Sequence, residues 1–284
     1  MPDLKPMAFG EILDGSLTIF RRHFGLFVKL GVVALWLPVS ITIYVSLAGG
    51  QQQHLGLALL ASLIQYFAGL FLSASAIRVI SDSYLGEAPQ FGDAIALGAS
   101  KIWSLFVAGL AKGIILAGIG LLIFVVGAVT VPTLMAGGGS GGAALMLILA
   151  ITLGGWFLTF VACGYAVTTP IVVLENLASA TDSLGRSWGL TRGFKLRIFG
   201  IFFVAGLIVY LPAMVVGAVA GVLGAQSVMI GSVFEVFAAA LPIVLTPLFS
   251  CVVTLLYYDL RVRREGFDLQ VLSEQLGALS TGAH

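Results

Sequence analysis

Charged residues are scarce in this sequence, and their scarcity excludes most classes of soluble protein. Asp, Glu, Lys and Arg make up 10% of the 284 residues, whereas hydrophobic residues make up 59%. A soluble domain carries about a quarter of its residues as charged side chains, because these coat its surface. The composition therefore argues against a cytosolic enzyme, a nucleic-acid-binding protein and a disordered chain. It predicts an integral membrane protein.

Histidine and cysteine are also rare, which limits the chemistry that the chain can perform. The three histidines, His23, His54 and His284, lie outside the long apolar runs, and the two cysteines, Cys163 and Cys251, lie inside them. Metal sites need clustered His, Cys or carboxylate ligands. A serine or cysteine nucleophile needs a neighbouring base. We therefore expect no enzymatic activity, no catalytic residue, no metal site and no cofactor.

Long apolar runs are what the sequence has in abundance. A helix that crosses the bilayer needs about 20 predominantly apolar residues, and six charge-poor runs reach that length. They predict an all-α, polytopic membrane protein with six transmembrane helices. The predicted spans are Gly25–Leu47, Leu55–Ser81, Trp103–Thr133, Ala143–Leu174, Ile198–Leu223 and Val228–Tyr258. The third, fourth and sixth are longer than the minimum, which leaves a tilt, a kink or a projection open.

The connections between the spans differ in charge. Those at 48–54, 134–142 and 224–227 contain no Lys or Arg, so that all 14 basic residues lie at or near the other connections and the termini. Basic residues are retained on the cytoplasmic side of an inner membrane. We therefore expect a multi-pass protein of the cell inner membrane with both termini in the cytoplasm.

The cytoplasmic segments suggest an internal repeat. Apolar residues between Phe9 and Phe24 recur at three- and four-residue spacing opposite a charged face, which is typical of an amphipathic helix in the membrane interface. The segment Phe9–Leu13 resembles Phe91–Ile95, and Asp182–Leu184 has the equivalent place in a third unit. The pattern predicts a single membrane domain of three repeated hairpins, each preceded by such a helix. The repeat units are about 7–84, 89–174 and 176–258, and 259–284 is a cytoplasmic tail.

Glu235 is the only acidic residue on the side without basic residues, and ionisable groups near membrane depth are functional candidates. About 23 residues of helix separate it from Tyr258, which places it roughly 35 Å away, near the outer boundary of the bilayer. It is either a solvated interface carboxylate or an intramembrane polar site that handles ions. Pro242 and Pro247 in the same span free backbone carbonyls that can line a cavity.

Acidic and basic residues occur together where the spans leave the bilayer on the basic side. Carboxylate–guanidinium pairs there could lock each amphipathic helix to the next hairpin. Alternatively, a collar of basic residues could hold anionic lipid head groups. The candidate residues for either role are Glu175, Arg186, Trp188, Arg192, Asp259, Arg261 and Arg263.

Four stretches of the sequence also resemble a known family. Pro170–Asn176 with Ser183–Arg192, the carboxy-terminal Leu255–Asp268 and the opening Phe9–Asp14 are similar to the bacterial family named for the membrane domain of glycerophosphoryl diester phosphodiesterase. The resemblance implies a polytopic inner-membrane protein. The sequence contains no phosphodiesterase barrel, so the resemblance implies no activity. The positions that match the family pattern are Glu175, Arg186, Trp188, Asp259, Arg261 and Gly266.

Two functions therefore remain open. The first is a non-enzymatic membrane protein that interacts with lipids or serves as an accessory or scaffold subunit of a membrane complex. Its expected partners are membrane lipids and other membrane subunits or a second copy of the chain, with no nucleic acid. The alternative is a transporter or channel for a small or apolar solute, for which Glu235 is the candidate site.

Overall fold

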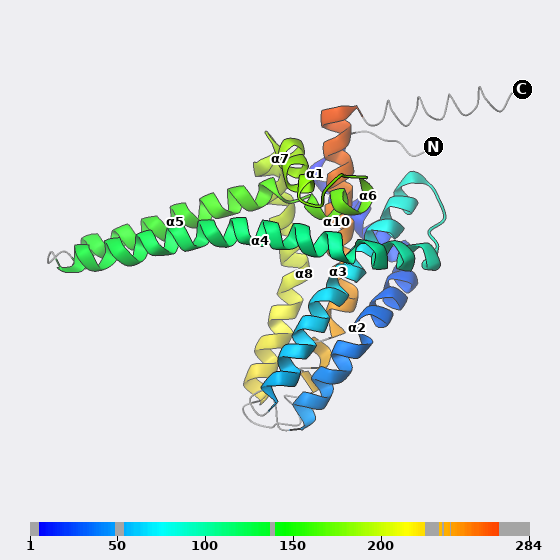
Figure 1. Ribbon diagram of the computed structural model, residues 1–284, viewed down its shortest axis with the longest axis horizontal. Helices are drawn as coiled ribbons and strands as arrows, with labels where there is room; N and C mark the ends of the chain where they lie inside the picture. Colours follow the sequence, from blue (N-terminus) through cyan, green and yellow to red (C-terminus); the bar gives the residue numbers. More distant parts are fainter. Residues whose placement is uncertain are drawn as a thin grey trace, which may run out of the picture.

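The computed structural model describes residues 6–48, 54–136, 140–224, 233–234, 236–238 and 240–266, and the described chain is helical with no strand. This confirms the predicted all-α class. Short helices precede or interrupt the long ones (Figure 1). The described helices are α1 (Phe9–Arg22), α2 (Phe24–Leu47), α3 (Leu55–Leu85), α4 (Phe91–Ala136), α5 (Ser140–Gly164), α6 (Thr168–Leu174), α7 (Asp182–Thr191), α8 (Lys195–Gly224) and α10 (Pro242–Glu265).

Six segments of the described chain are long and apolar enough to cross a membrane, which confirms the number of spans that the sequence predicts. Each contains at least one stretch of 18 residues with no more than two charged side chains. The segments are Phe24–Val45, Leu55–Leu85, Phe91–Val129, Leu149–Leu174, Lys195–Val219 and Val236–Glu265.

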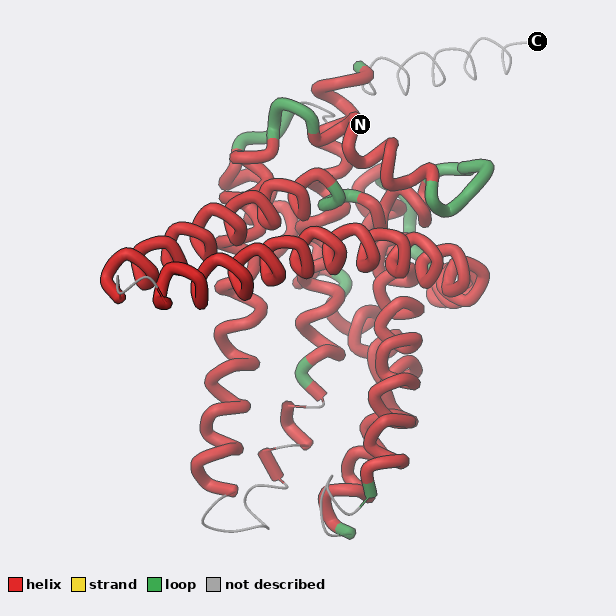
Figure 2. Tube along the Cα trace, turned by 60° about the vertical axis from the view of Figure 1, so that its left-hand side comes forward, coloured by secondary structure: helices red, strands yellow, loops and turns green. Residues whose placement is uncertain are grey.

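Helix α10 forms the centre of a bundle with α2, α3 and α8, which run alongside one another in Figures 1 and 2. Nearly every α10 side chain between Pro247 and Leu260 is buried, because α1, α2, α3 and α8 all pack against this helix. Glycine allows the closest approach. A Cβ on Gly31 of α2 would lie 3.0 Å from the carbonyl oxygen of Ile243 in α10.

Helices α4 and α5 leave the bundle as a long antiparallel hairpin that runs across it (Figures 1 and 2). We call α5 and residues 113–136 of α4 the arm. Large apolar side chains on the arm, such as Leu121, Leu122 and Phe124, are more than 60% exposed. The sequence predicts two membrane-spanning helices here and leaves a tilt, a kink or a projection open. Their course across the bundle could not be read from the sequence, because a hydrophobic run specifies apolar surroundings and not the direction of the helix.

Two boundaries also differ from those that the sequence predicts. The segment before the third span does not form a separate helix, since α4 runs without a break for 46 residues from Phe91. The fourth predicted span is broken, because α5 ends at Gly164 and α6 begins at Thr168. Pro170 has no N–H group for a helix that continues from α5, whereas the first turn of α6 tolerates it.

Helix α1 packs its apolar face against protein. Ile12 and Phe20 are buried, and Leu255 of α10 lies 3.3 Å from the place where a Cβ on Gly15 would be. The Glu11 carboxylate accepts a hydrogen bond from the Ala8 N–H at 2.6 Å, which fixes the start of the helix. Part of the apolar face expected to lie in the interface is therefore buried against α2 and α10, whereas Phe9 is 39% exposed. The threefold repeat stays a prediction.

Candidate functional site

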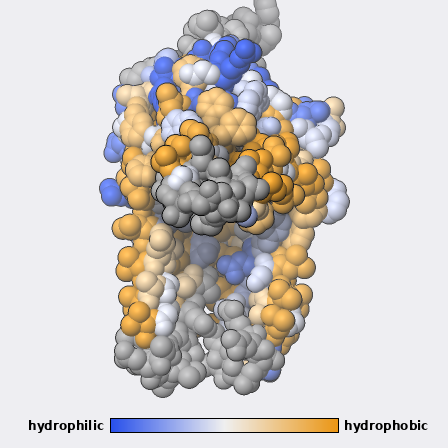
Figure 3. All heavy atoms as spheres, turned by 90° about the vertical axis from the view of Figure 1, so that its left-hand side faces the viewer, coloured by the Kyte–Doolittle hydropathy of each residue, from blue (hydrophilic) through white to orange (hydrophobic). Residues whose placement is uncertain are grey.

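Most of the polar chemistry of the described chain lies at one end of the bundle, where α1, α6 and α7 meet the adjoining ends of α2, α3, α8 and α10. We call this the basic end. Figure 3 shows hydrophilic side chains gathered there above a broad hydrophobic surface. A chain with so few charges concentrates them where water or lipid head groups can solvate them. The basic end is therefore the first candidate for a functional site.

Arg186 of α7 is the centre of a first ion-pair cluster. Its Nε lies 3.0 Å from Glu175 Oε2, and its Nη2 donates to Glu265 Oε2 at 2.8 Å. Arg261 Nε also pairs with Glu265, at 3.2 Å, and the Tyr257 hydroxyl donates to Glu175 Oε1 at 2.9 Å. The hydrogen bonds to Glu265 and then to Glu175 raise the pKa of Arg186. The cluster joins α7 and the segment after α6 to the end of α10.

Asp259 is the centre of a second cluster, and its side chain is fully buried. Its carboxylate accepts the Met7 N–H at 2.8 Å and pairs with Arg263 Nε at 3.0 Å and Arg197 Nη1 at 3.3 Å. Both arginines also donate to the Met7 carbonyl. The carboxylate therefore ties the amino-terminal segment, α8 and α10 together through charge-assisted hydrogen bonds.

Trp188 joins α7 to the arm and to α8. A Cβ on Gly164, the last residue of α5, would overlap the Trp188 ring, so only glycine allows this approach. The Lys195 ammonium lies 3.3 Å from the centroid of the Trp188 ring and 3.8 Å from that of Phe160. The Tyr165 ring is a further neighbour, at 5.5 Å between centroids. Trp188 is thus a packing centre and not a member of either ion-pair cluster.

The base of the arm is fixed by hydrogen bonds to carbonyl groups at the end of α5. Such carbonyls have no partner within their own helix. The Gly164 carbonyl accepts from Ser187 Oγ at 3.0 Å and from Thr191 Oγ1 at 3.1 Å. Lys112 Nζ of α4 donates to the Tyr165 carbonyl at 3.4 Å. Side chains of α7 therefore replace the helical partner that the Gly164 carbonyl lacks, and Lys112 adds a contact to the Tyr165 carbonyl, which also accepts from Thr168.

The structure distributes the candidate residues over three places. Glu175, Arg186 and Arg261 belong to the first cluster, and Asp259 and Arg263 belong to the second. Trp188 lies against the arm. Arg192 is exposed, and its carbonyl accepts a hydrogen bond from Arg264. Glu235 lies outside the described residues.

Sequence reasoning did not single out Tyr257, Lys195 and Arg197, which take part in these contacts. Lys195 and Arg197 begin the fifth span, so their position at a membrane boundary was a usable signal. The contact of Tyr257 could not be predicted in this way, because aromatic residues are common near the ends of membrane-spanning helices.

Several basic side chains of the basic end are exposed and form no ion pair with another described residue. Arg21 and Arg22 end α1, and Lys29 lies in the second turn of α2. Arg192 and Arg264 lie between α7 and α8 and at the end of α10. Exposed carboxylates such as Glu11, Asp14 and Asp182 lie at the same end, but the described chain holds 13 Lys and Arg against 9 Asp and Glu, so a net positive charge remains there.

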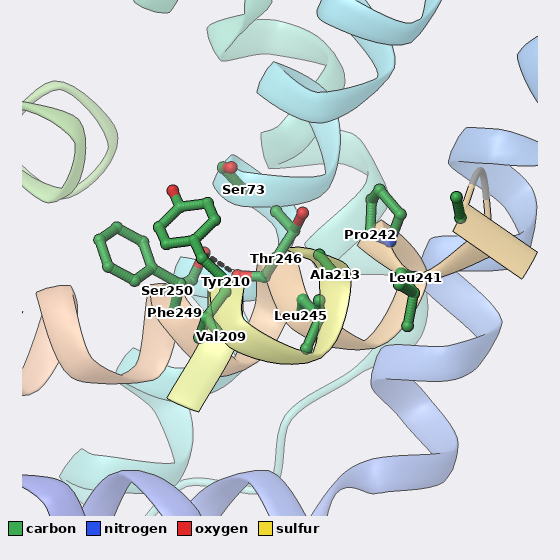
Figure 4. A pocket seen from close by; sticks show the side chains of 11 residues that line it. Ser73, Val209, Tyr210, Ala213, Leu241, Pro242, Leu245, Thr246, Phe249 and Ser250 are labelled. Atoms are coloured by element: carbon green, nitrogen blue, oxygen red, sulfur yellow. Dashed lines mark hydrogen bonds between the residues drawn. The ribbon is translucent and has the colours of Figure 1, made fainter. Parts of the chain in front are cut away.

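A cavity of about 290 Å³ lies within the bundle, between α3, α8 and α10 (Figure 4). Four hydroxyl side chains line it among apolar ones: Ser73 of α3, Tyr210 of α8, and Thr246 and Ser250 of α10. Ser250 Oγ donates to the Thr246 carbonyl at 2.9 Å. Pro242 also lines the cavity, at the first turn of α10.

Comparison with known proteins gives no match: no protein family, curated protein or solved structure matches the chain. Within the part of the chain that the structure describes, no group of His, Cys, Asp and Glu side chains could hold a metal ion. We therefore base the functional proposal on the basic end and the bundle cavity.

Proposed function

We propose that this chain is a non-enzymatic, multi-pass protein of the cell inner membrane, with its basic end in the cytoplasm and bound to anionic lipid head groups. It serves as a lipid-interacting accessory or scaffold subunit of a membrane complex. Its relation to the membrane part of the glycerophosphoryl diester phosphodiesterase family is part of the same proposal.

One observation carries the proposal: exposed, unpaired basic side chains are gathered at one end of an otherwise apolar molecule. The cytoplasmic leaflet is negatively charged, and each Lys or Arg near its surface contributes about 1 kcal/mol of attraction. The exposed, unpaired basic side chains take no part in the two internal ion-pair clusters. Instead, Arg186 and Asp259 hold α7 and the amino-terminal segment in place, so that the exposed side chains are presented on a fixed frame.

Neutralising the exposed pair at the end of α1 is expected to weaken binding to anionic lipid. In the double variant Arg21→Gln/Arg22→Gln the two losses amount to about 2 kcal/mol, or roughly 30-fold in the dissociation constant for phosphatidylglycerol vesicles. The measurement is vesicle binding of the detergent-solubilised chain at low salt. Arg21→Lys/Arg22→Lys keeps the charge and should bind as the unmodified chain does. Equal binding of the neutralised and the unmodified chain would contradict the proposal.

The bundle cavity supports a second candidate, a transporter or channel for a small or apolar solute. A cavity of this size, with a few hydroxyl groups among apolar side chains, has the composition of a small-molecule site. Enlarging Ala213 to Leu would narrow the cavity and should reduce flux into reconstituted vesicles. Glu235→Gln should also alter the flux if that carboxylate handles ions. Flux no greater than that of empty liposomes for every solute class tested would remove this candidate.

A further inference from the structure

Lys195 is the buried basic residue that neither ion-pair cluster uses. Lys195 is the first residue of α8, and the residue is 8% exposed. It forms no ion pair with any other residue in the described part of the chain. The aromatic faces of Trp188 and Phe160 compensate part of its charge. An ammonium group with no carboxylate beside it, at the edge of an apolar region, favours an external anion.

The backbone at the same place also favours an anion. Helix α8 has 30 residues, and the N–H groups of its first turn, Lys195 to Arg197, have no acceptor within the helix. The positive end of the helix dipole adds to the charge of Lys195. Arg192 and Arg264 lie beside this turn, and the guanidinium carbon of Arg264 is 5.6 Å from the centroid of the Phe194 ring.

An apolar groove leads away from Lys195, in the angle where the arm meets the bundle. It is lined by Trp156 and Phe160 of α5 and by Leu196 and Phe199 of α8, together with Lys195 itself. Trp156 and Leu196 are more than half exposed on this side. The groove is too shallow to enclose a small molecule, but its apolar side chains suit a hydrocarbon chain that lies along it. A molecule with an anionic phosphate and an acyl chain matches both parts.

We propose that Lys195 and the first turn of α8 bind the phosphate of an anionic phospholipid, whose acyl chain lies in the groove between α5 and α8. This inference rests on the proposed function, because it names one specific site within the lipid-binding basic end. The surface arginines attract the leaflet as a whole. The Lys195 site holds a single lipid at the base of the arm.

The test is a lipid titration of the full chain in nonionic detergent. Substituting Phe for the exposed Trp36 and Trp103 leaves Trp156 and Trp188, both beside the site, as the tryptophan fluorophores. The probes are dioctanoyl phosphatidylglycerol, dioctanoyl phosphatidylcholine and glycerol 3-phosphate, which has the phosphate but no acyl chain. Saturable binding of phosphatidylglycerol alone is expected. Equally tight binding of glycerol 3-phosphate would overturn the lipid assignment.

Lys195→Met should weaken phosphatidylglycerol binding about tenfold or more, because the charge-assisted contacts to the phosphate are lost. Lys195→Arg keeps the charge and should retain most of the affinity, which separates loss of the site from loss of folding. Ser62→Ala changes an exposed side chain of α3 outside the basic end and should leave this titration unchanged. Unchanged affinity in Lys195→Met would overturn the site but leave the proposed function intact. Absence of any preference for anionic lipid in the unmodified chain would overturn both.

Discussion

Asp259→Asn is expected to be the most destabilising single substitution at the basic end, with a loss of about 3 kcal/mol or more in the free energy of unfolding. Asparagine has the same shape and can still accept the Met7 N–H. It removes the negative charge that faces Arg197 and Arg263, and these two guanidinium groups then lie side by side without compensation. The midpoint of thermal unfolding in detergent, followed by circular dichroism, measures the effect.

Asp14→Asn is the matched control, since Asp14 is exposed on α1 and forms no ion pair with another described residue. Its midpoint should stay within the error of the unmodified chain. A double variant that also replaces Arg197 with Met should regain part of the loss, because it removes one of the uncompensated charges. An Asp259→Asn midpoint equal to that of Asp14→Asn would mean that the buried carboxylate does not hold the basic end together.

Gly164→Ala is expected to have the next largest effect, a loss of about 1 to 3 kcal/mol in the free energy of unfolding. The new methyl group would overlap the Trp188 ring, which is held between Lys195 and Tyr165 and has little room to move. A displaced ring also separates the Gly164 carbonyl from Ser187 and Thr191. Thermal unfolding measures the loss, and limited proteolysis of the segment between α6 and α7 reports whether α7 is released.

Gly155→Ala provides a control in the same helix. A Cβ at Gly155 has no neighbour within 4 Å, so alanine should be neutral or slightly stabilising through its higher helix propensity. If both alanine variants unfold at the same temperature, the contact between Gly164 and Trp188 does not constrain the base of the arm.

The sequence predicted the helices well because length and hydropathy are local properties. Six charge-poor runs became six helices long enough to cross a membrane. Direction is not local, which is why the course of the arm could not be predicted. The residues from Gly113 to Ala136 do not indicate whether their helix lies along the bundle or across it. The break after Gly164 could have been anticipated from Pro170, since proline favours the first turn of a helix.

Ion pairs within one helix could be predicted from the sequence, whereas ion pairs between helices could not. Arg261 with Glu265, and Asp259 with Arg263, are four residues apart on one helix, so their contacts follow from helical geometry. The contact between Arg197 and Asp259 spans 62 residues and depends on how α8 packs against α10. The isolation of Lys195 from any described carboxylate also depends on packing, and no spacing rule could have revealed it.

Binding of anionic lipid at the basic end is the central claim, and the lipid content of the purified chain tests it most directly. The unmodified protein is extracted from native membranes in mild detergent, and its retained lipids and proteins are identified by mass spectrometry. The account predicts phosphatidylglycerol or other anionic phospholipid enriched over its share of the membrane, together with partner subunits. A lipid-free monomer without partners, or retained lipid in the proportions of the bulk membrane, would contradict it.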